Sequence, residues 1–132
     1  MTSRNSQPHP LTDLQQAILD VLWETRESTA EEIRRGLRPR HPLTDSSVRT
    51  LLRRLEARGL VEHRVEGKVF VYRAAIAAER LGAGAVKQII RRFWGGSVEQ
   101  FLTGMVDEEL VSADELQRLA KKVRQRKESG HD

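Results

Sequence analysis

The most informative segment of the sequence is TDSSVRTLLRRL, which runs from Thr44 to Leu55. Its apolar residues recur at the i, i+3, i+4 and i+7 spacing of a helix that buries one face. They are Val48, Leu51, Leu52 and Leu55. Gly59 is expected to end this helix, and two strand-like runs follow, at 60–65 and 69–73, around the turn Glu66-Gly67-Lys68. A helix followed by a basic β-hairpin predicts a winged helix-turn-helix.

The polar surface of that helix carries groups suited to DNA. Hydroxyls near a helix N-terminus can approach base edges in a major groove, and arginine offers a fork to guanine or a charge to phosphate. The hairpin cations suit phosphate or a minor groove, although an ordinary hairpin with solvated charges has the same pattern. We expect Arg49 to read a base edge, because it lies in the first two turns. The predicted DNA-binding residues are Thr44, Ser46, Ser47, Arg49, Thr50, Arg53, Arg54, Arg64 and Lys68.

Positive charge is concentrated in the same part of the chain. Residues 34–73 include eleven basic and four acidic residues, which gives this segment a net charge of +7. The whole chain has a net charge of +4, so the rest of the chain has a net charge of −3. Such a concentration of positive charge is expected of a phosphate-binding face, but a solvated arginine-rich surface would have the same charge pattern. Its coincidence with the helix-then-hairpin order favours nucleic-acid binding.

Two shorter helices are predicted before the recognition helix. Thr12 with Gln15, and Thr29 with Glu32, fit the capping-box pattern of a helix start. The first helix is expected to end near Thr25. Its buried face is predicted to consist of Leu14, Ala17, Ile18, Val21 and Leu22. The buried face of the second helix is predicted to consist of Ala30, Ile33 and Leu37. Prolines at 39 and 42 break the chain before the third helix. We therefore expect a flexible lead-in over 1–10 and a winged-helix DNA-binding domain over 11–75.

A helical region is predicted over 76–123, followed by a disordered tail over 124–132. Gly95-Gly96 should end its first helix, Ser97 should cap the second, and Ser112 with Glu115 fits a third capping box. Short helices with one apolar face cannot easily bury themselves alone, so this region packs either against a second chain or on its own winged helix. We favour a homodimer, because a two-fold dimer matches two DNA half-sites. The predicted dimerisation residues are Ile89, Ile90, Phe93, Trp94, Val98, Phe101, Leu102, Leu116, Leu119 and Val123.

Composition excludes several other classes of function. The 132 residues include no cysteine, which excludes thiolate chemistry. They also include no apolar run of about 18 residues, which argues against direct membrane insertion. The start lacks the apolar centre of a signal peptide, so a cytoplasmic location is expected. The four histidines lack metal-site spacing, and no phosphate loop or nucleophile elbow is present. We therefore expect no enzyme activity, cofactor or metal. Two alternatives remain, a protein-interaction winged helix and an antitoxin-like regulator acting through its C-terminal helices.

The order of motifs resembles the penicillinase repressor (BlaI/MecI/CopY) family of transcriptional regulators. Residues 11–23 look like the opening helix of that family, and 46–55, running into Gly59-Leu60-Val61, resemble its recognition helix. Phe93-Trp94-Gly95-Gly96-Ser97, followed by Asp107-Glu108-Glu109-Leu110, resembles its dimerisation domain. The likeness covers about residues 11–123.

The resemblance implies a homodimeric repressor on a palindromic operator in double-stranded DNA. It places Ser46, Ser47, Arg49 and Thr50 toward the DNA, with the wing on the backbone. One branch of the family is released when a membrane-bound sensor metalloprotease, which responds to β-lactam antibiotics, cuts the dimerisation domain. Another branch senses copper through C-terminal cysteines, which this chain lacks. The expected cleavage segment is Thr103, Gly104 and Met105, which departs from the Asn-Phe pair of well-known members.

Overall fold

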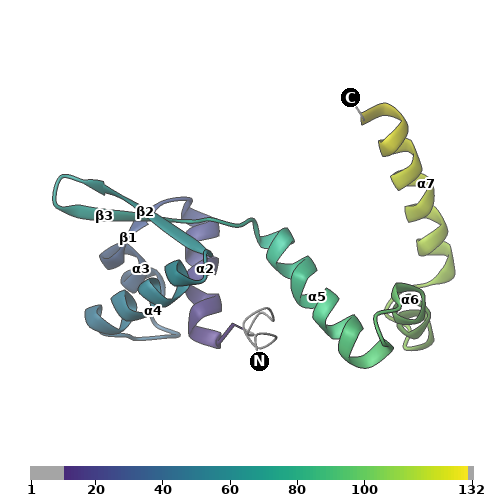
Figure 1. The fold of residues 1–132 in the computed structure, drawn as a ribbon, viewed down its shortest axis with the longest axis horizontal. Coiled ribbons are helices and arrows are strands. Elements are labelled where there is room, and N and C mark those ends of the chain that lie inside the picture. The colour runs from purple at the N-terminus through teal and green to yellow at the C-terminus, as the bar shows by residue number, and fades with distance from the viewer. Residues whose placement is uncertain (1–10, 131–132) are drawn as a thin grey trace, which may run out of the picture. The chain divides into compact units, whose positions relative to one another are not determined.

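The computed structural model describes residues 11–130, so the prediction for residues 1–10 lies outside the described residues. Within them the chain is mainly helical, with one small antiparallel sheet (Figure 1). This confirms the predicted fold class, a winged helix-turn-helix followed by a helical region. The elements are α2 (Asp13–Thr25), β1 (Ser28–Thr29), α3 (Ala30–Gly36), α4 (Asp45–Ala57), β2 (Val61–Glu66), β3 (Val69–Ala74), α5 (Ala78–Trp94), α6 (Val98–Asp107) and α7 (Ala113–Gly130).

Both predicted capping boxes of the first two helices form. Before α2, the Gln15 amide donates to Thr12 Oγ1 at 3.1 Å while Gln15 Oε1 accepts from the Thr12 amide at 3.1 Å. Before α3, Thr29 and Glu32 exchange the same pair of bonds at 3.2 and 2.8 Å. Each box satisfies backbone N–H groups that the first helical turn leaves without partners.

The core of the winged helix collects apolar side chains from all three of its helices and from the hairpin. Val48, Leu52 and Leu55 are fully buried, as their spacing predicted, whereas Leu51 is half-buried. Leu19 lies outside the predicted stripe of α2 and is nevertheless fully buried. The reason is that α2 contacts α3 and α4 as well as β3, so more than one of its faces is covered.

The sheet has one strand more than the sequence indicated. β1 pairs with β3, giving the antiparallel order β1-β3-β2. Two residues show no periodicity of their own, and Thr29 was recognised only as a helix cap. The hairpin turns at Gly67, whose φ of +64° lies in the left-handed region that glycine adopts without strain. Its register pairs His63 with Tyr72 and Val65 with Phe70, so these four side chains share one face of the sheet.

The winged helix extends further along the chain than residue 75. The chain forms two compact units, one ending at Ala83 and the other beginning at Gly84. The Trp23 indole donates to the Ile76 carbonyl at 2.9 Å, and Leu81 packs against the core of the first unit. These two contacts attach the segment after β3 and the first turn of α5 to the winged helix, from which the sequence boundary at 75 had separated them.

The C-terminal unit is held by ring packing between α5 and α6. Trp94 meets Phe101 edge-on, with 5.3 Å between ring centroids. A Cβ at Gly104 would lie 3.3 Å from the same indole, so glycine permits this close approach. Ser97 caps α6, and Ser112 with Glu115 forms the third predicted capping box.

The predicted disordered tail is corrected for residues 124–130, because α7 continues to Gly130. The run from Arg124 to Glu128 consists of long, unbranched side chains that lose little rotamer freedom in a helix. Residues 131–132 lie outside the described part of the chain.

Replacing the cap of α3 should destabilise the winged helix. Thr29→Ala removes the hydroxyl that accepts from the Glu32 amide and should lower the free energy of unfolding by about 0.5–2 kcal/mol. Urea unfolding followed by circular dichroism measures this change. Thr29→Ser is the matched control, because it keeps the hydroxyl and should remain within a few tenths of a kcal/mol of the wild type. Equal destabilisation by both substitutions would contradict the capping role.

Candidate nucleic-acid interface

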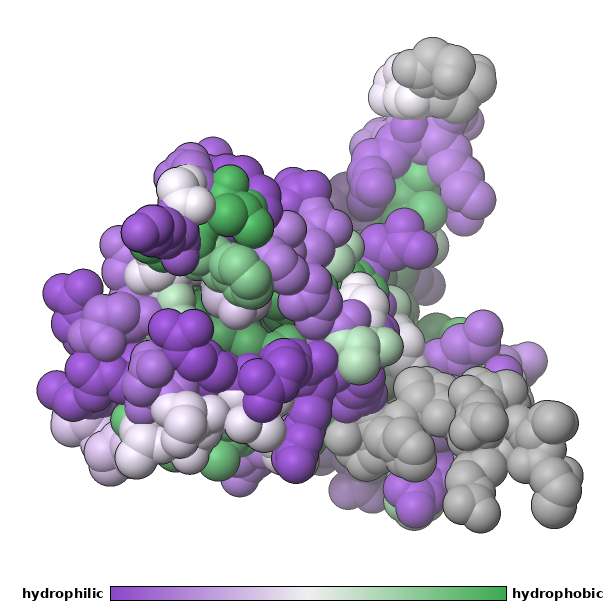
Figure 2. Space-filling model, turned by 60° about the vertical axis from the view of Figure 1, so that its left-hand side comes forward, coloured by the Kyte–Doolittle hydropathy of each residue, from purple (hydrophilic) through white to green (hydrophobic). Residues whose placement is uncertain are grey.

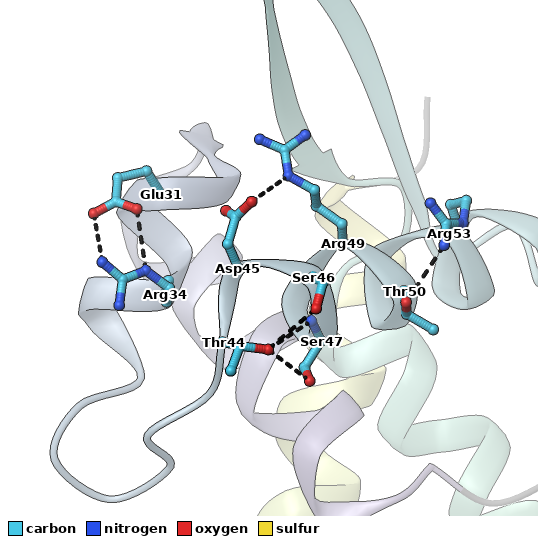
Figure 3. Close-up of polar contacts among 9 residues, drawn as sticks. All are labelled: Glu31, Arg34, Thr44, Asp45, Ser46, Ser47, Arg49, Thr50 and Arg53. Carbon is cyan, nitrogen blue, oxygen red and sulfur yellow. Dashed lines mark hydrogen bonds and ion pairs between the residues drawn. The ribbon is translucent and has the colours of Figure 1, made fainter.

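A group of hydroxyls lies at the N-terminus of α4. Thr44 Oγ1 accepts from the Ser47 amide at 3.1 Å and donates to Ser47 Oγ at 3.0 Å, and Ser46 Oγ lies 3.3 Å away (Figure 3). The hydroxyl of Thr44, predicted as a DNA ligand, therefore serves as the helix cap in the free protein. Ser46 and Ser47 are exposed beside it and can donate or accept toward a ligand.

The outward face of α4 is fixed by what the opposite face buries. Since Val48, Leu52 and Leu55 point into the core, Ser46, Thr50 and Arg53 align on the other side at i, i+4 and i+7. The Arg53 guanidinium donates to Thr50 Oγ1 at 3.4 Å, which joins two members of this row (Figure 3). The row presents hydroxyls toward the start of the helix and a cation toward its end.

Arg49 lies on the flank of this face and is held by its own helix. Its Nε donates to Asp45 Oδ2 at 2.8 Å, one turn earlier, and this bond raises the pKa of the Arg49 guanidinium. Both side chains are about half exposed, at 54% and 53%, so the pair contributes little to stability. Its terminal nitrogens point away from Asp45 (Figure 3).

The wing carries an arginine that is bound by two carboxylates. Arg64 donates to Glu27 at 2.5 Å and to Glu66 at 2.7 Å, and hydrogen bonding to both carboxylates raises the pKa of its guanidinium well above the usual value. A phosphate would have to share or displace these partners. Lys68, by contrast, is exposed at the hairpin turn. Of the two wing cations that the sequence indicated, Lys68 is therefore the more accessible to a phosphate.

The recognition helix and the wing are linked by a polar contact. His63 Nδ1 on β2 lies 2.8 Å from Glu56 Oε2 on α4, and the His63 ring stacks on Phe70 with 4.2 Å between centroids. The distal wing is apolar as well, with Val65, Val69 and Phe70 between 42% and 58% exposed. Figure 2, which turns this side of the unit forward, shows hydrophobic surface bordered by hydrophilic side chains.

All nine predicted DNA-binding residues lie on α4, its cap or the wing, within one unit. The sequence analysis did not identify the acidic residues that pair with Arg49 and Arg64. Asp45 was detectable, because Asp45 and Arg49 have the i, i+4 spacing of a helical ion pair. Glu27 had no local signal, since it is 37 residues from Arg64 and only the folded chain brings the two together.

The apolar residues predicted for dimerisation are mostly uncovered within the chain. Ile90 alone among them is buried, at 8% exposure. Trp94, Phe101 and Leu116 are half-buried. The exposed members are Ile89, Phe93, Val98, Leu102, Leu119 and Val123, with Phe93 at 68%. Large apolar side chains exposed together mark an interaction surface in many proteins.

Residues 11–130 also lack two features that would point to other functions. Within that range no three or more His, Cys, Asp or Glu side chains are grouped to hold a metal ion. No helix there has both the length and the apolar character needed to span a bilayer.

The comparisons with known proteins agree on one family. The penicillinase repressor family model matches residues 11–125. The methicillin resistance regulatory protein MecI of Staphylococcus aureus (strain N315) is 18% identical over 115 residues, covering 87% of this chain and 94% of that protein. The penicillinase repressor of Bacillus licheniformis is 22% identical over 109 residues, covering 83% and 85% respectively.

A solved structure of similar sequence is the monomeric form of Bacillus licheniformis BlaI in complex with the blaP half-operator. It is 25% identical and covers 55% of this chain and 89% of its own, with a TM-score of 0.47. The family match spans the winged helix, α5, α6 and most of α7, nearly the same range over which the motif order indicated a resemblance. The chain therefore belongs to the penicillinase repressor family, which consists of DNA-binding transcriptional repressors and not of enzymes.

Proposed function

We propose that this repressor acts in the cytoplasm as a homodimer that places one α4 helix in the major groove of each half of a palindromic operator. The observation that carries the proposal is the outward face of α4, where Ser46, Thr50 and Arg53 align opposite the buried stripe. Hydroxyls and arginines are the side chains that read base edges and hold phosphates. The wing lies beside this helix, and Lys68 at its turn suits a backbone phosphate.

The dimer is proposed to form through the C-terminal unit. Its helices expose large apolar side chains and bury only Ile90, so a single copy leaves most of its apolar surface in water. Covering a side chain of this size contributes roughly 1.5–3 kcal/mol. A second copy of the chain offers the same apolar faces and supplies the second recognition helix that a palindrome requires.

Selection from a random-sequence duplex library tests the proposed function. The wild-type protein should enrich inverted repeats whose half-site centres lie about one helical turn apart. Unrelated sequences, or no enrichment, would contradict operator recognition and favour a protein-interaction module. Co-purification of a stoichiometric unrelated protein on the C-terminal helices would favour the antitoxin-like alternative.

Substitutions on α4 and the wing should weaken DNA binding in different ways. Arg49→Ala should cost about 1–3 kcal/mol on the selected duplex and relax discrimination at one base pair. Lys68→Ala should weaken selected and random duplexes alike and reduce the salt slope of log K by about one unit, because one phosphate contact is lost. Fluorescence anisotropy across a salt series measures both.

The control for both variants is Arg80→Ala, which removes an exposed cation at the start of α5. It should leave affinity and salt slope close to those of the wild type. An equal loss on selected and random DNA for Arg49→Ala would disprove its role in base reading.

Removing an exposed ring from the C-terminal unit should weaken the dimer. Phe93→Ala should raise the dimer dissociation constant by an amount equivalent to about 2 kcal/mol or more, since aromatic anchors dominate interfaces. Sedimentation equilibrium measures the constant, and Arg92→Ala, at the adjacent exposed position, is the matched control. A stable dimer formed by a chain truncated after Ala75 would contradict the assignment of this unit.

Release is proposed to follow a cut within the cleavage segment Thr103, Gly104 and Met105, made by a membrane-bound sensor metalloprotease. The support is the family resemblance and the position of the segment. It lies inside α6, so local opening must expose it, and a cut there separates α7 from the Trp94–Gly104 packing.

Cutting the isolated dimer should therefore lower operator affinity. Limited proteolysis with thermolysin, with the cut identified by mass spectrometry, should reduce binding of the selected duplex at least about tenfold, because the two half-sites are no longer held as one unit. The uncut dimer incubated with inactivated protease is the control. Undiminished binding after a cut between Leu102 and Val106 would refute this mechanism.

A further inference from the structure

One face of the hairpin consists of apolar and aromatic side chains and contacts α4 at its base. The register places His63 opposite Tyr72 and Val65 opposite Phe70, and alternate residues of a strand share a face. The His63 ring stacks on Phe70 at an interplanar angle of 11°, and its centroid lies 5.6 Å from that of Tyr72. These four residues form what we call the ring face. Val69, although adjacent to Phe70 on β3, lies on the opposite face of the hairpin.

The ring face has a buried base and an exposed end. Tyr72 is buried and belongs to the core of the winged helix, whereas Val65 and Phe70 are exposed. The exposed pair lies nearer the turn of the hairpin, and Figure 1 shows this turn projecting past α3 and α4. Large apolar side chains that are exposed next to each other mark a contact surface in many proteins.

A hydrogen bond between α4 and β2 fixes how the ring face meets the recognition helix. His63 Nδ1 lies 2.8 and 3.0 Å from the two carboxylate oxygens of Glu56. Because an ionised carboxylate only accepts, Nδ1 carries the hydrogen and donates it. The same imidazole stacks on Phe70, so a single side chain connects α4 to the exposed end of the ring face.

Cations border the ring face on two sides. Burial raises the pKa of Tyr72, and Arg49 and Arg53 of α4 lie close enough that their charges oppose this rise. Lys68 is exposed at the turn, near the other end of the ring face. Glu56, a carboxylate at the base of this surface, is already hydrogen-bonded. An apolar surface bordered by cations matches the backbone of DNA, in which apolar sugar faces alternate with anionic phosphates.

We propose that the exposed end of the ring face packs on a deoxyribose of the operator backbone beside α4, with Phe70 as the contacting side chain. The Glu56–His63 hydrogen bond holds the wing in place for this contact, so Glu56 and His63 are positioning residues. The contact adds affinity without reading sequence, because every nucleotide carries the same sugar. This inference rests on the proposed binding of α4 to DNA, and it adds an apolar contact to the phosphate contact of Lys68.

Phe70→Ala tests the contact in the full-length protein. It should weaken binding of the selected duplex and of a random-sequence duplex by about tenfold each, measured by fluorescence anisotropy. The salt slope of log K should stay unchanged, since an apolar contact releases no counterions. Val69→Ala is the matched control, because it truncates an exposed neighbour on the other face of the hairpin, and it should bind within about twofold of the wild type.

An unchanged affinity of Phe70→Ala, or an equal loss in Val69→Ala, would overturn the contact. Circular dichroism checks that both variants fold, and fluorine NMR of protein labelled with fluorophenylalanine gives a measurement that needs no truncation. The resonance of Phe70, identified by its absence from Phe70→Leu, should shift when either duplex is added. A resonance that does not shift would also overturn the contact.

Glu56→Ala and Glu56→Gln separate positioning from charge. Both remove the negative charge, but glutamine keeps a carbonyl oxygen that can accept from His63 Nδ1. Glu56→Ala should therefore bind both duplexes about three- to fivefold more weakly than Glu56→Gln. In a Phe70→Ala background the two should bind equally, because the contact that they position is gone. Equal affinities with Phe70 present, or a difference that persists without it, would overturn the positioning role.

Failure of the proposed function gives a different result from failure of this inference. If selection enriched no inverted repeat while Phe70→Ala still weakened binding of the random duplex, operator recognition would fail and the wing contact would stand. If selection succeeded and Phe70→Ala bound like the wild type, only the wing contact would be overturned. A wild type that binds neither duplex would overturn both.

Discussion

Burial of the apolar stripe of α4 fixes the orientation of this helix and organises the winged-helix unit. Val48, Leu52 and Leu55 have no measurable exposure and pack with side chains from α2, α3 and the hairpin. Each contributes roughly 1.5–3 kcal/mol by leaving water, and a rotation of the helix would lose most of this. Because the inner face is fixed, the hydroxyls and arginines of the outer face are fixed as well.

The electrostatics of this unit are more balanced than its net charge indicates. Arg49 is paired with Asp45, Arg64 with Glu27 and Glu66, and Arg34 with Glu31. These exposed pairs contribute little to folding. They do orient the guanidinium groups in the free protein, and a phosphate or base must compete with a carboxylate to bind them. Among the predicted DNA ligands that the structure describes, Arg53, Arg54 and Lys68 are in none of the recorded ion pairs.

The two units differ in how much apolar surface they bury. The winged helix has a closed core, to which Trp23 and Leu81 attach the start of α5. The C-terminal unit instead rests on the packing of Trp94 against Phe101 and Gly104, and its other apolar side chains stay largely exposed. A winged helix with a closed core is thus followed by a helical unit whose apolar side chains remain largely uncovered.

Elements whose signals are local could be predicted from the amino-acid sequence. Capping boxes at Thr12, Thr29 and Ser112, the stripe of α4 and the glycine turn at Gly67 involve residues a few positions apart, so a pattern of spacing was sufficient to predict them. It also indicated the family, because the motif order runs along the chain.

Features that join distant residues became visible only in the folded chain. β1 forms because β3 lies beside it, Leu19 is buried because α2 is covered on more than one side, and Glu27 reaches Arg64 across 37 positions. The length of α7 also differed from expectation, since its charged end was taken for a tail although its residues favour helix. Contacts of this kind form between residues that are close in space but far apart in the sequence. The spacing of residues along the chain therefore does not predict them.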